Sequence, residues 1–259
     1  MEIKAKKSLG QNFLQDENIL KNIANSIETN DKDLIIEIGP GKGALTKYLK
    51  NKNSYLICYE IDTRMIDILK KYEDSKTKII YKDILEADIE NDTKDIDYDN
   101  IYIIANIPYY ITTPIIKKVI ELKKLKSMSI LVQKEVAERF SAKPRSKAYG
   151  SLTVYLNYYF DINYLFDVKN TCFNPMPKVD SAVINFKRKE KKYEVKNEEV
   201  LFKLIEDSFK MKRKTLKNNL KSYNWNKIKQ ILEQNDLTES VRAEEISLEI
   251  YIAIANNLA

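Results

Sequence analysis

The chain has 259 residues, of which 44% are hydrophobic and 32% are charged, as in ordinary soluble globular proteins. Its 44 Lys and Arg residues outnumber its 38 Asp and Glu residues, and the net charge of +6 permits an acidic partner such as nucleic acid without requiring one. The chain contains no His, which excludes imidazole bases, Ser-His-Asp and Cys-His catalysis, and His-ligated metals.

Two further features narrow the class of protein. Cys58 and Cys172 are isolated, and Cys58 lies in the apolar run 55–59, which predicts a buried strand, so we expect neither a metal site nor a disulfide framework. The first residues are basic and no apolar signal region follows them, and no stretch approaches the roughly 18 apolar residues of a membrane span. We therefore expect a soluble, cytoplasmic protein without a membrane partner.

The amino-terminal segment combines a polar and aromatic stretch with a helix. Residues 8–14 read Ser-Leu-Gly-Gln-Asn-Phe-Leu, which is unusual for a disordered tail, and we interpret them as an arm docked on the rest of the protein. In residues 16–27, apolar side chains recur at 19, 20, 23, 24 and 27. This spacing predicts an amphipathic helix that Asp16 caps.

A glycine-rich turn follows the first predicted strand, residues 34–38. Residues 39–45 read Gly-Pro-Gly-Lys-Gly-Ala-Leu and contain three of the five glycines in the chain. Gly lets the backbone turn tightly and approach a ligand, and the start of the next helix supplies unpaired N–H groups, so we predict a nucleotide-cofactor loop. The spacing Gly39-x-Gly41-x-x-Ala44, with an acid at Glu60, also fits a dinucleotide fingerprint, and NAD stays an alternative.

Polar residues recur every 23 positions along the first half of the chain. Glu37, Glu60, Asp83 and Asn106 each lie in or directly after an apolar run, and these runs are 34–38, 55–59, 78–82 and 101–105. The spacing suits one strand, one helix and a return loop, so we predict an α/β fold in which these residues meet at the carboxyl edge of a parallel sheet. Glu60 could bind two ribose hydroxyls and Asp83 an adenine amino group. Their charge suits a sulfonium better than a pyrophosphate, although Lys42 leaves a phosphate ligand open.

Residues 106–109, Asn-Ile-Pro-Tyr, close the apolar run 101–105 at the position where open α/β sheets bind ligands. The amide oxygen of Asn106 and a neighbouring carbonyl can accept both hydrogens of an exocyclic amine, while Tyr109 offers a ring for stacking and Pro108 fixes the turn. Without other signals, a turn in which Asn106 bonds its own backbone would be the favoured explanation of these residues.

Near residue 187 the predicted secondary structure changes from a mixture of strands and helices to helices. Up to there we predict helices over 62–72, from 113 onward, over 133–140 and over 149–159, and strands over 129–132 and 182–186. After it the predicted elements are helices, over 198–211, 215–223, 225–234 and 247–258. The charge run 187–192 separates the two patterns, so we predict an α/β domain over 1–190 and a small helical domain over 191–259.

Residues 173–183 are predicted to be a rigid loop, because prolines at 175 and 177 precede the strand over 182–186. Phe173 in this loop is either a core residue or a ligand-stacking residue. Basic residues cluster at 4–7, 143–147, 187–192 and 210–214. Each run alone is typical of a solvated face, and together they predict a surface that contacts phosphates.

Six stretches in combination resemble the small-subunit rRNA adenine dimethyltransferases, the KsgA/Dim1 family, over nearly the whole chain. They are 8–14, 37–46, 106–109, 133–140, 173–183 and 213–220. The resemblance implies a Rossmann-like S-adenosylmethionine domain followed by a small helical domain. It also implies N6,N6-dimethylation of two adjacent adenines in a hairpin near the 3′ end of the 16S rRNA, in an assembling 30S particle, by a monomeric enzyme.

The resemblance assigns roles to particular residues. Asn106, the carbonyl of Ile107, Pro108, Tyr109 and Phe173 would hold and stack the target adenine. The cofactor would contact Gln11, Asn12, Leu14, Gly39, Gly41, Glu60, Ile61, Asp83, Ile84 and Asn106. The RNA would contact Lys6, Lys7, Arg139, Arg145, Lys147, Lys178, Lys212, Arg213 and Lys214. Lys212 departs from the family, which commonly has Arg there, and Lys lacks the bidentate fork of Arg.

This reading implies that the target adenine leaves its helix before reaction, at a cost that stacking on aromatic rings can offset. No strong base is needed, because the methylated amine is acidic and can lose its proton to water.

Three alternative functions remain: a methyltransferase that modifies one adenine of large-subunit rRNA, a noncatalytic RNA-binding factor, and an NAD oxidoreductase. The stretches 178–181 and 215–220 favour the small-subunit family.

Overall fold

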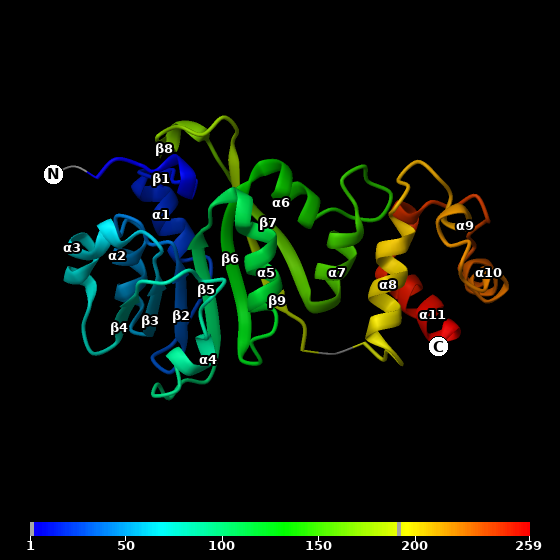
Figure 1. Ribbon diagram of the computed structural model, residues 1–259, viewed down its shortest axis with the longest axis horizontal. Helices are drawn as coiled ribbons and strands as arrows, with labels where there is room; N and C mark the ends of the chain where they lie inside the picture. Colours follow the sequence, from blue (N-terminus) through cyan, green and yellow to red (C-terminus); the bar gives the residue numbers. More distant parts are fainter. Residues whose placement is uncertain (1–2, 191–192) are drawn as a thin grey trace. The chain divides into compact units, whose positions relative to one another are not determined.

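The computed structural model describes residues 3–190 and 193–259. Its chain forms two compact units (Figure 1). The first comprises the chain up to Ala137 together with Asn163–Arg188, and the second comprises Glu138–Ile162 and the chain from Lys189 onward.

The first unit is built on a seven-stranded sheet in which five neighbouring strands run parallel and the central ones are buried. Its seven strands are β2 (Leu34–Ile38), β3 (Tyr55–Tyr59), β4 (Thr77–Ile80), β5 (Ile101–Asn106), β6 (Leu125–Gln133), β7 (Phe160–Val168) and β9 (Ser181–Arg188). They lie in the order β4-β3-β2-β5-β6-β9-β7, and β9 is antiparallel to β6. The predicted α/β fold with a parallel sheet is therefore confirmed.

The strand order reverses between β2 and β5. The chain runs from β2 outward to β3 and β4, and then returns to the other side of β2 as β5. Leu34 of β2 is paired with Tyr55 of β3 and with Ile101 of β5. At such a reversal the loops after the two strands diverge, which leaves a crevice at their carboxyl ends.

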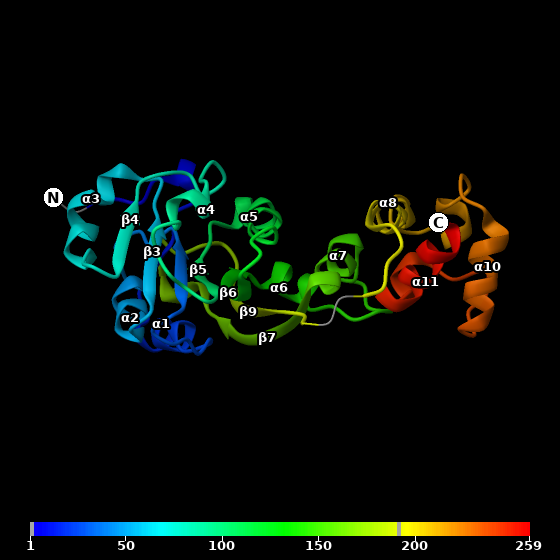
Figure 2. The same cartoon turned by 90° about the horizontal axis from the view of Figure 1, so that it is seen from below.

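Helices cover both faces of this sheet, as Figure 2 shows for α1 and α2 on one face and α5 on the other. The α-helices of this part of the chain are α1 (Glu17–Ala24), α2 (Thr46–Leu49), α3 (Ile66–Leu69), α4 (Ile89–Asp92), α5 (Thr112–Val119) and α6 (Lys134–Phe140). Leu20 of α1, Leu49 of α2 and Leu69 of α3 pack with Ile35 and Leu56 of the sheet in one apolar cluster. The Asp16 side chain caps α1 by accepting from two backbone amides, as predicted.

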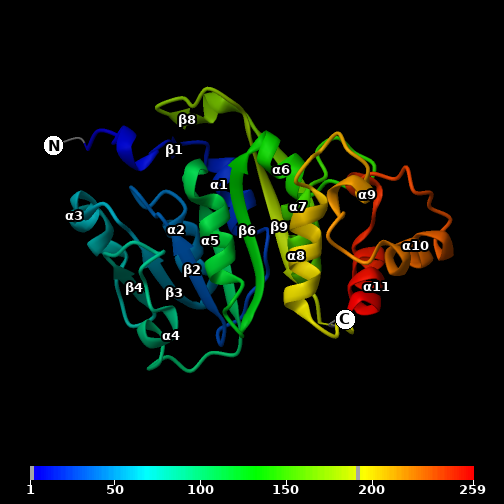
Figure 3. The same ribbon diagram turned by 45° about the vertical axis from the view of Figure 1, so that its right-hand side comes forward.

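Short 3-10 turns and a two-stranded ribbon complete the secondary structure. The 3-10 turns are η1 (Lys7–Leu9), η2 (Lys50–Lys52), η3 (Thr63–Met65), η4 (Lys70–Tyr72), η5 (Tyr109–Ile111), η6 (Asn170–Cys172) and η7 (Ala243–Glu245). The predicted helix over 62–72 is thus one α-helical turn between two 3-10 turns. The ribbon pairs β1 (Phe13–Leu14) with β8 (Phe173–Asn174), near the end of the sheet where β6 leads into α6 (Figure 3).

The second unit is a helical cluster. Its helices are α7 (Ser151–Tyr159), α8 (Glu198–Ser208), α9 (Leu216–Asn219), α10 (Trp225–Gln234) and α11 (Leu248–Leu258). The side chains of Asn197, Thr215 and Asn224 cap α8, α9 and α10 by accepting a backbone N–H in the first turn.

The helical unit contains more of the chain than we expected. Residues 138–162, which we placed in the first domain, group with it because Val154 and Tyr158 of α7 join its apolar core. The Tyr158 hydroxyl also donates to Glu198 of α8 at 2.9 Å. The expected boundary at 190–191 touches residues 191–192, which lie outside the described residues, so the exact division stays a proposal.

Candidate active site

A pocket lies in the first unit at the carboxyl ends of β2, β3 and β5, where the strand order reverses. It is lined by most of the residues that the sequence singled out: Gln11, Asn12, Leu14, Gly39, Gly41, Glu60, Ile61, Asn106, Ile107, Pro108 and Tyr109. Glu37, which the 23-residue spacing predicted to meet Glu60 and Asn106, also lines it, as do Leu9, Gly10 and Phe13, to which we assigned no role in the site. The predicted arm, glycine turn and Asn-Ile-Pro-Tyr segment therefore meet around one space.

The glycine turn has a backbone that side chains rarely adopt. Gly39 and Gly41 have φ angles of +70° and +56°, in the left-handed region. A Cβ atom on Gly41 would lie 3.0 Å from the ring of Phe13, which comes from the amino-terminal arm. The absence of a side chain at Gly41 therefore lets the arm pack directly on the turn.

Glu60 ties the turn after β2 to the turn after β3. Its carboxylate is 3% exposed and accepts from the backbone amides of Gly41 and Asp62, both at 2.8 Å. Burial raises the pKa of this carboxyl above its ordinary value, and the two amides counteract that effect. A carboxylate has about four acceptor positions, so Glu60 can still accept from hydroxyl groups of a ligand.

Two other side chains give the pocket its chemical character. Glu37, at the end of β2, is 1% exposed, and burial raises the pKa of its carboxyl to about 7. Ile61 lines the pocket with an apolar side chain that is 50% exposed. The acceptor at Glu60 and the exposed apolar surface of Ile61 fit the ribose and the base of a nucleoside.

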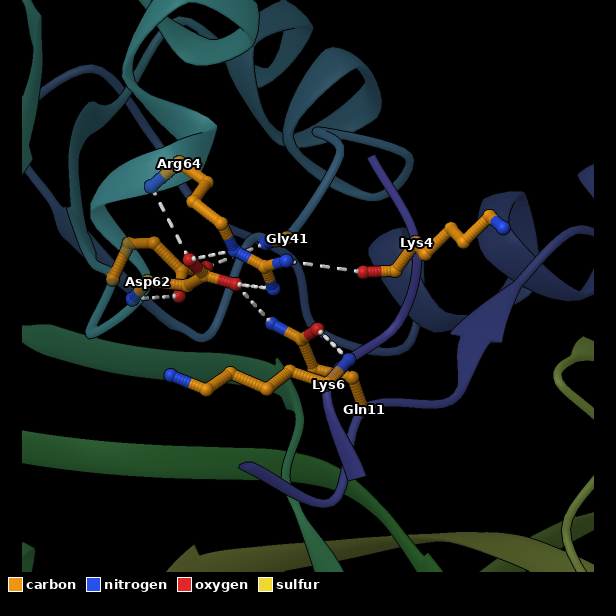
Figure 4. Close-up of polar contacts among 7 residues, drawn as sticks. Lys4, Lys6, Gln11, Gly41, Asp62 and Arg64 are labelled. Atoms are coloured by element: carbon orange, nitrogen blue, oxygen red, sulfur yellow. Dashed lines mark hydrogen bonds and ion pairs between the residues drawn. The ribbon is translucent and has the colours of Figure 1, made fainter. Parts of the chain in front are cut away.

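The amino-terminal arm is fastened beside the pocket by a network around Asp62 (Figure 4). Gln11 donates through Nε2 to Asp62 Oδ2 at 2.8 Å and accepts from the backbone N–H of Lys6 at 2.8 Å. Arg64 donates to both Asp62 oxygens, at 2.8 and 2.6 Å, and to the carbonyl of Lys4 at 3.3 Å. The Arg64 hydrogen bonds lower the pKa of Asp62 to about 2, so this acceptor is charged. The docked arm is confirmed.

Sequence reasoning missed Asp62 and Arg64 in this network. The available signal was local: Asp62 follows the predicted ribose acid by two residues, and its side chain accepts from the backbone N–H of Arg64 at the start of η3. We read this position only as the start of a helix.

Asn106 is the last residue of β5 and lies where the arm crosses the pocket. Its side-chain amide donates to the carbonyl of Asn12 at 3.4 Å, and no hydrogen bond to its amide oxygen occurs among the described residues. Ile107 is 1% exposed, and Pro108 directly precedes η5. An acceptor oxygen is thus available at the pocket wall.

Tyr109 is held by a residue that we did not include in the site. Its hydroxyl lies 2.6 Å from the hydroxyl of Ser181, which is fully buried at the start of β9. Burial raises the pKa of the Tyr109 phenol above its ordinary value. The segment 178–181 and the Asn-Ile-Pro-Tyr segment, which the resemblance links, are therefore in contact.

Three predicted site residues do not line the pocket. Phe173 is 4% exposed and belongs to the apolar cluster, where it pairs across the ribbon with Leu14. Asp83 follows the edge strand β4, and its side chain accepts from the backbone N–H of Leu85 at 2.9 Å. Ile84 is 3% exposed. The roles predicted for these three residues remain predictions.

The predicted RNA-contacting residues are exposed in both units. Lys6, Lys7 and Lys178 lie in the first unit, and Arg139, Arg145, Lys147, Lys212, Arg213 and Lys214 lie in the second. Within the second unit, the Lys212 ammonium donates to the carbonyl of Lys147 at 2.9 Å. This bond brings together two of the basic clusters identified in the sequence.

Neither a metal cluster nor a membrane span occurs in the described part of the chain. No group of three or more His, Cys, Asp or Glu side chains in residues 3–190 and 193–259 could hold a metal ion. None of the helices there is long and apolar enough to cross a membrane. Cys58 is buried and Cys172 is partly exposed, and both are free thiols.

Comparisons with known proteins agree along the whole chain. The family "Ribosomal RNA adenine dimethylase" matches residues 2–259. Similar proteins named "Ribosomal RNA small subunit methyltransferase A" include those of Streptococcus thermophilus, 41% identical over 98% of this chain and 91% of theirs, and Clostridium botulinum, 42% identical over 96% and 92%.

Solved structures show the same architecture. A dimethyladenosine transferase from Plasmodium falciparum has a TM-score of 0.77 and 26% identity, over 93% of this chain and 95% of that one. The 23S rRNA methyltransferase ErmE has a TM-score of 0.74 over 95% and 99%, and at 23% identity it shows the fold alone. On its residues, its fold and these comparisons, the chain belongs to the ribosomal RNA adenine dimethylase family.

Proposed function

We propose that this protein dimethylates N6 of two adjacent adenines in a hairpin near the 3′ end of small-subunit (16S) rRNA, with S-adenosylmethionine as the methyl donor. The observation that carries this proposal is the position of Asn106, Ile107, Pro108 and Tyr109 on the wall of a pocket whose other wall is the glycine turn. The small-subunit substrate is supported by the names of the relatives that are 41–42% identical.

The pocket suits the cofactor in three respects. The buried carboxylate of Glu60 would accept from its ribose hydroxyls, and the exposed Ile61 would cover its base. Gly39 and Gly41, in their left-handed conformations, would let the backbone of the turn approach its methionine part. Asp83 and Ile84 would reach its adenine from the end of β4. When bound, S-adenosylmethionine supplies an electrophilic methyl group on a sulfonium.

The residues of the chain contribute mainly orientation. The amide oxygen of Asn106 and the carbonyl of Ile107 would accept the two hydrogens of the adenine amine. This favours a pyramidal nitrogen whose lone pair is available for attack. Tyr109, fixed by its 2.6 Å contact with Ser181, would stack on the base. For Phe173 to stack as well, its ring would have to leave the apolar cluster. Correct orientation can contribute about 7–11 kcal/mol to catalysis in favourable cases.

The exposed basic residues of both units would contact phosphates of the RNA. Such contacts position the substrate and are weakened by salt. The pocket lies within one unit of one chain, so chemistry requires no second copy, which supports a monomeric enzyme. An assembling 30S particle in the cytoplasm is the substrate that this proposal entails.

Asn106→Ala tests the proposal most simply. Because Asn106 would act on the adenine amine, the variant should lose methyl transfer to unmethylated small subunits by at least about 100-fold, while the cofactor dissociation constant changes little. Glu60→Gln is the comparison variant. It keeps the size of the side chain but removes the charge, and it should chiefly weaken cofactor binding. Full turnover in Asn106→Ala would remove Asn106 from the reaction.

One alternative keeps the same fold. A noncatalytic RNA-binding factor would not need an amine-binding segment such as Asn-Ile-Pro-Tyr. The open acceptor oxygen of Asn106 therefore argues against this alternative. It predicts small-subunit binding without methyl transfer by the unmodified protein, which the same assay would detect.

A further inference from the structure

The pocket has an exposed aromatic ring at its rim that no role above uses. Tyr110 directly follows the Asn-Ile-Pro-Tyr segment, and its side chain is 62% exposed. It is not part of the pocket lining, whereas its neighbours Pro108 and Tyr109 are. We infer that Tyr110 is the stacking platform for the base next to the target adenine. This inference rests on the proposed function.

The ring lies next to a residue that lines the pocket. A Cβ atom on Gly10, which lines the pocket, would lie 3.0 Å from Tyr110 Cε1 and 3.2 Å from Cδ1. The ring therefore lies beside the bare backbone of the arm. Its own backbone belongs to η5, where Ile111 donates to the carbonyl of Pro108 at 3.2 Å and the Thr112 hydroxyl to that of Tyr109 at 3.2 Å.

The substrate chemistry requires such a surface. An adenine that leaves its stack to enter the pocket exposes one face of the neighbouring base, and that base stays covalently attached at the mouth of the pocket. Aromatic side chains stack on bases of any sequence. Tyr109 and Tyr110 are consecutive residues of one turn, with Tyr109 anchored inward to Ser181 and Tyr110 exposed. Adjacent residues would thus serve adjacent nucleotides.

The position also bears on the order of events. When two adjacent adenines are modified in turn, each must occupy the pocket while the other lies outside it. A platform at the rim that accepts any base would hold the adenine outside the pocket whether or not that adenine already carries methyl groups. Stacking tolerates methylation of N6 because it uses the face of the ring and not its amine.

Tyr110→Ala, Tyr110→Phe and the control Leu165→Ala test this assignment with unmethylated small subunits. Leu165 is another exposed apolar residue of the same unit, 39% exposed, in β7. We expect Tyr110→Ala to raise KM for the subunits by about 5- to 150-fold, the range that loss of one stacked base gives. The cofactor dissociation constant should stay unchanged. Tyr110→Phe should behave as the unmodified enzyme, because stacking needs no hydroxyl.

A second experiment identifies the base that stacks on Tyr110. Subunits with an abasic nucleotide beside the target adenine should raise KM of the unmodified enzyme to the level of Tyr110→Ala, and should raise that of the variant no further. An equal rise in KM for the unmodified enzyme and for Tyr110→Ala would overturn the assignment. So would a weakened cofactor affinity with an unchanged KM, because Tyr110 would then only support the arm. If the unmodified enzyme did not methylate small subunits at all, the proposed function would fail first.

Discussion

Gln11→Ala should release the amino-terminal arm from the pocket. The variant removes the hydrogen bond that Gln11 donates to the charged Asp62, at 2.8 Å, and the one that it accepts from the backbone N–H of Lys6, also at 2.8 Å. It leaves the Asp62–Arg64 pair intact. A hydrogen bond to a charged group contributes about 1.5–3 kcal/mol, which corresponds to about 10- to 150-fold in an equilibrium. The ribbon that includes Leu14 still holds the arm, so we expect the lower half of this range.

The effect should appear as faster cofactor release, because residues 9–14 of the arm line the pocket. Stopped-flow measurements should show the dissociation rate of S-adenosylmethionine rising about 10-fold or more in Gln11→Ala. The association rate should be unchanged or higher. Gln15→Ala is the matched control, because Gln15 is exposed and its backbone N–H keeps its bond to Cys172. A dissociation rate equal to that of the control would refute the role of this network.

Two further substitutions test the interior of the site. Burial raises the pKa of Glu37 from 4.5 to about 7, so its stabilising contribution is present below pH 4.5 and is lost as the pH rises to about 7. Relative to Glu37→Gln, the unmodified protein should therefore lose up to about 3 kcal/mol of unfolding free energy between pH 4.5 and 8, measured by urea titration. A constant difference across this range would contradict the buried, protonated carboxyl. Gly41→Ala should cost about 1–2 kcal/mol from its positive φ and displace the Phe13 ring, lowering cofactor affinity in a binding titration. Gly150→Ala, where a Cβ meets no atom within 4 Å, should leave that affinity unchanged.

The parallel core of the sheet could be predicted from sequence because its strands are buried on both faces and appear as continuous apolar runs. Residues 34–38, 55–59 and 101–105 correspond closely to β2, β3 and β5. Strand β7 was missed. Its residues alternate between exposed and covered positions, with Asp161, Asn163 and Asp167 exposed, so no continuous apolar run marks this strand in the sequence.

The site was predictable where it depends on strand ends and not where it depends on distant contacts. The 23-residue spacing brought Glu37, Glu60 and Asn106 to one pocket. Asp83 has the same spacing but follows β4, an edge strand two positions from β2, so its distance from the reversal could not be seen in the spacing. The contact of Tyr109 with Ser181 joins segments 72 residues apart, and no local pattern predicts it.

The central claim is that this chain dimethylates adenines of small-subunit rRNA. The most direct measurement incubates the protein and S-adenosylmethionine with unmethylated small subunits and, separately, with large-subunit rRNA, and then maps N6,N6-dimethyladenine in each. We predict dimethyladenine at two adjacent positions of the small-subunit rRNA and none in the large-subunit rRNA. Product in the large-subunit rRNA alone would contradict the claim.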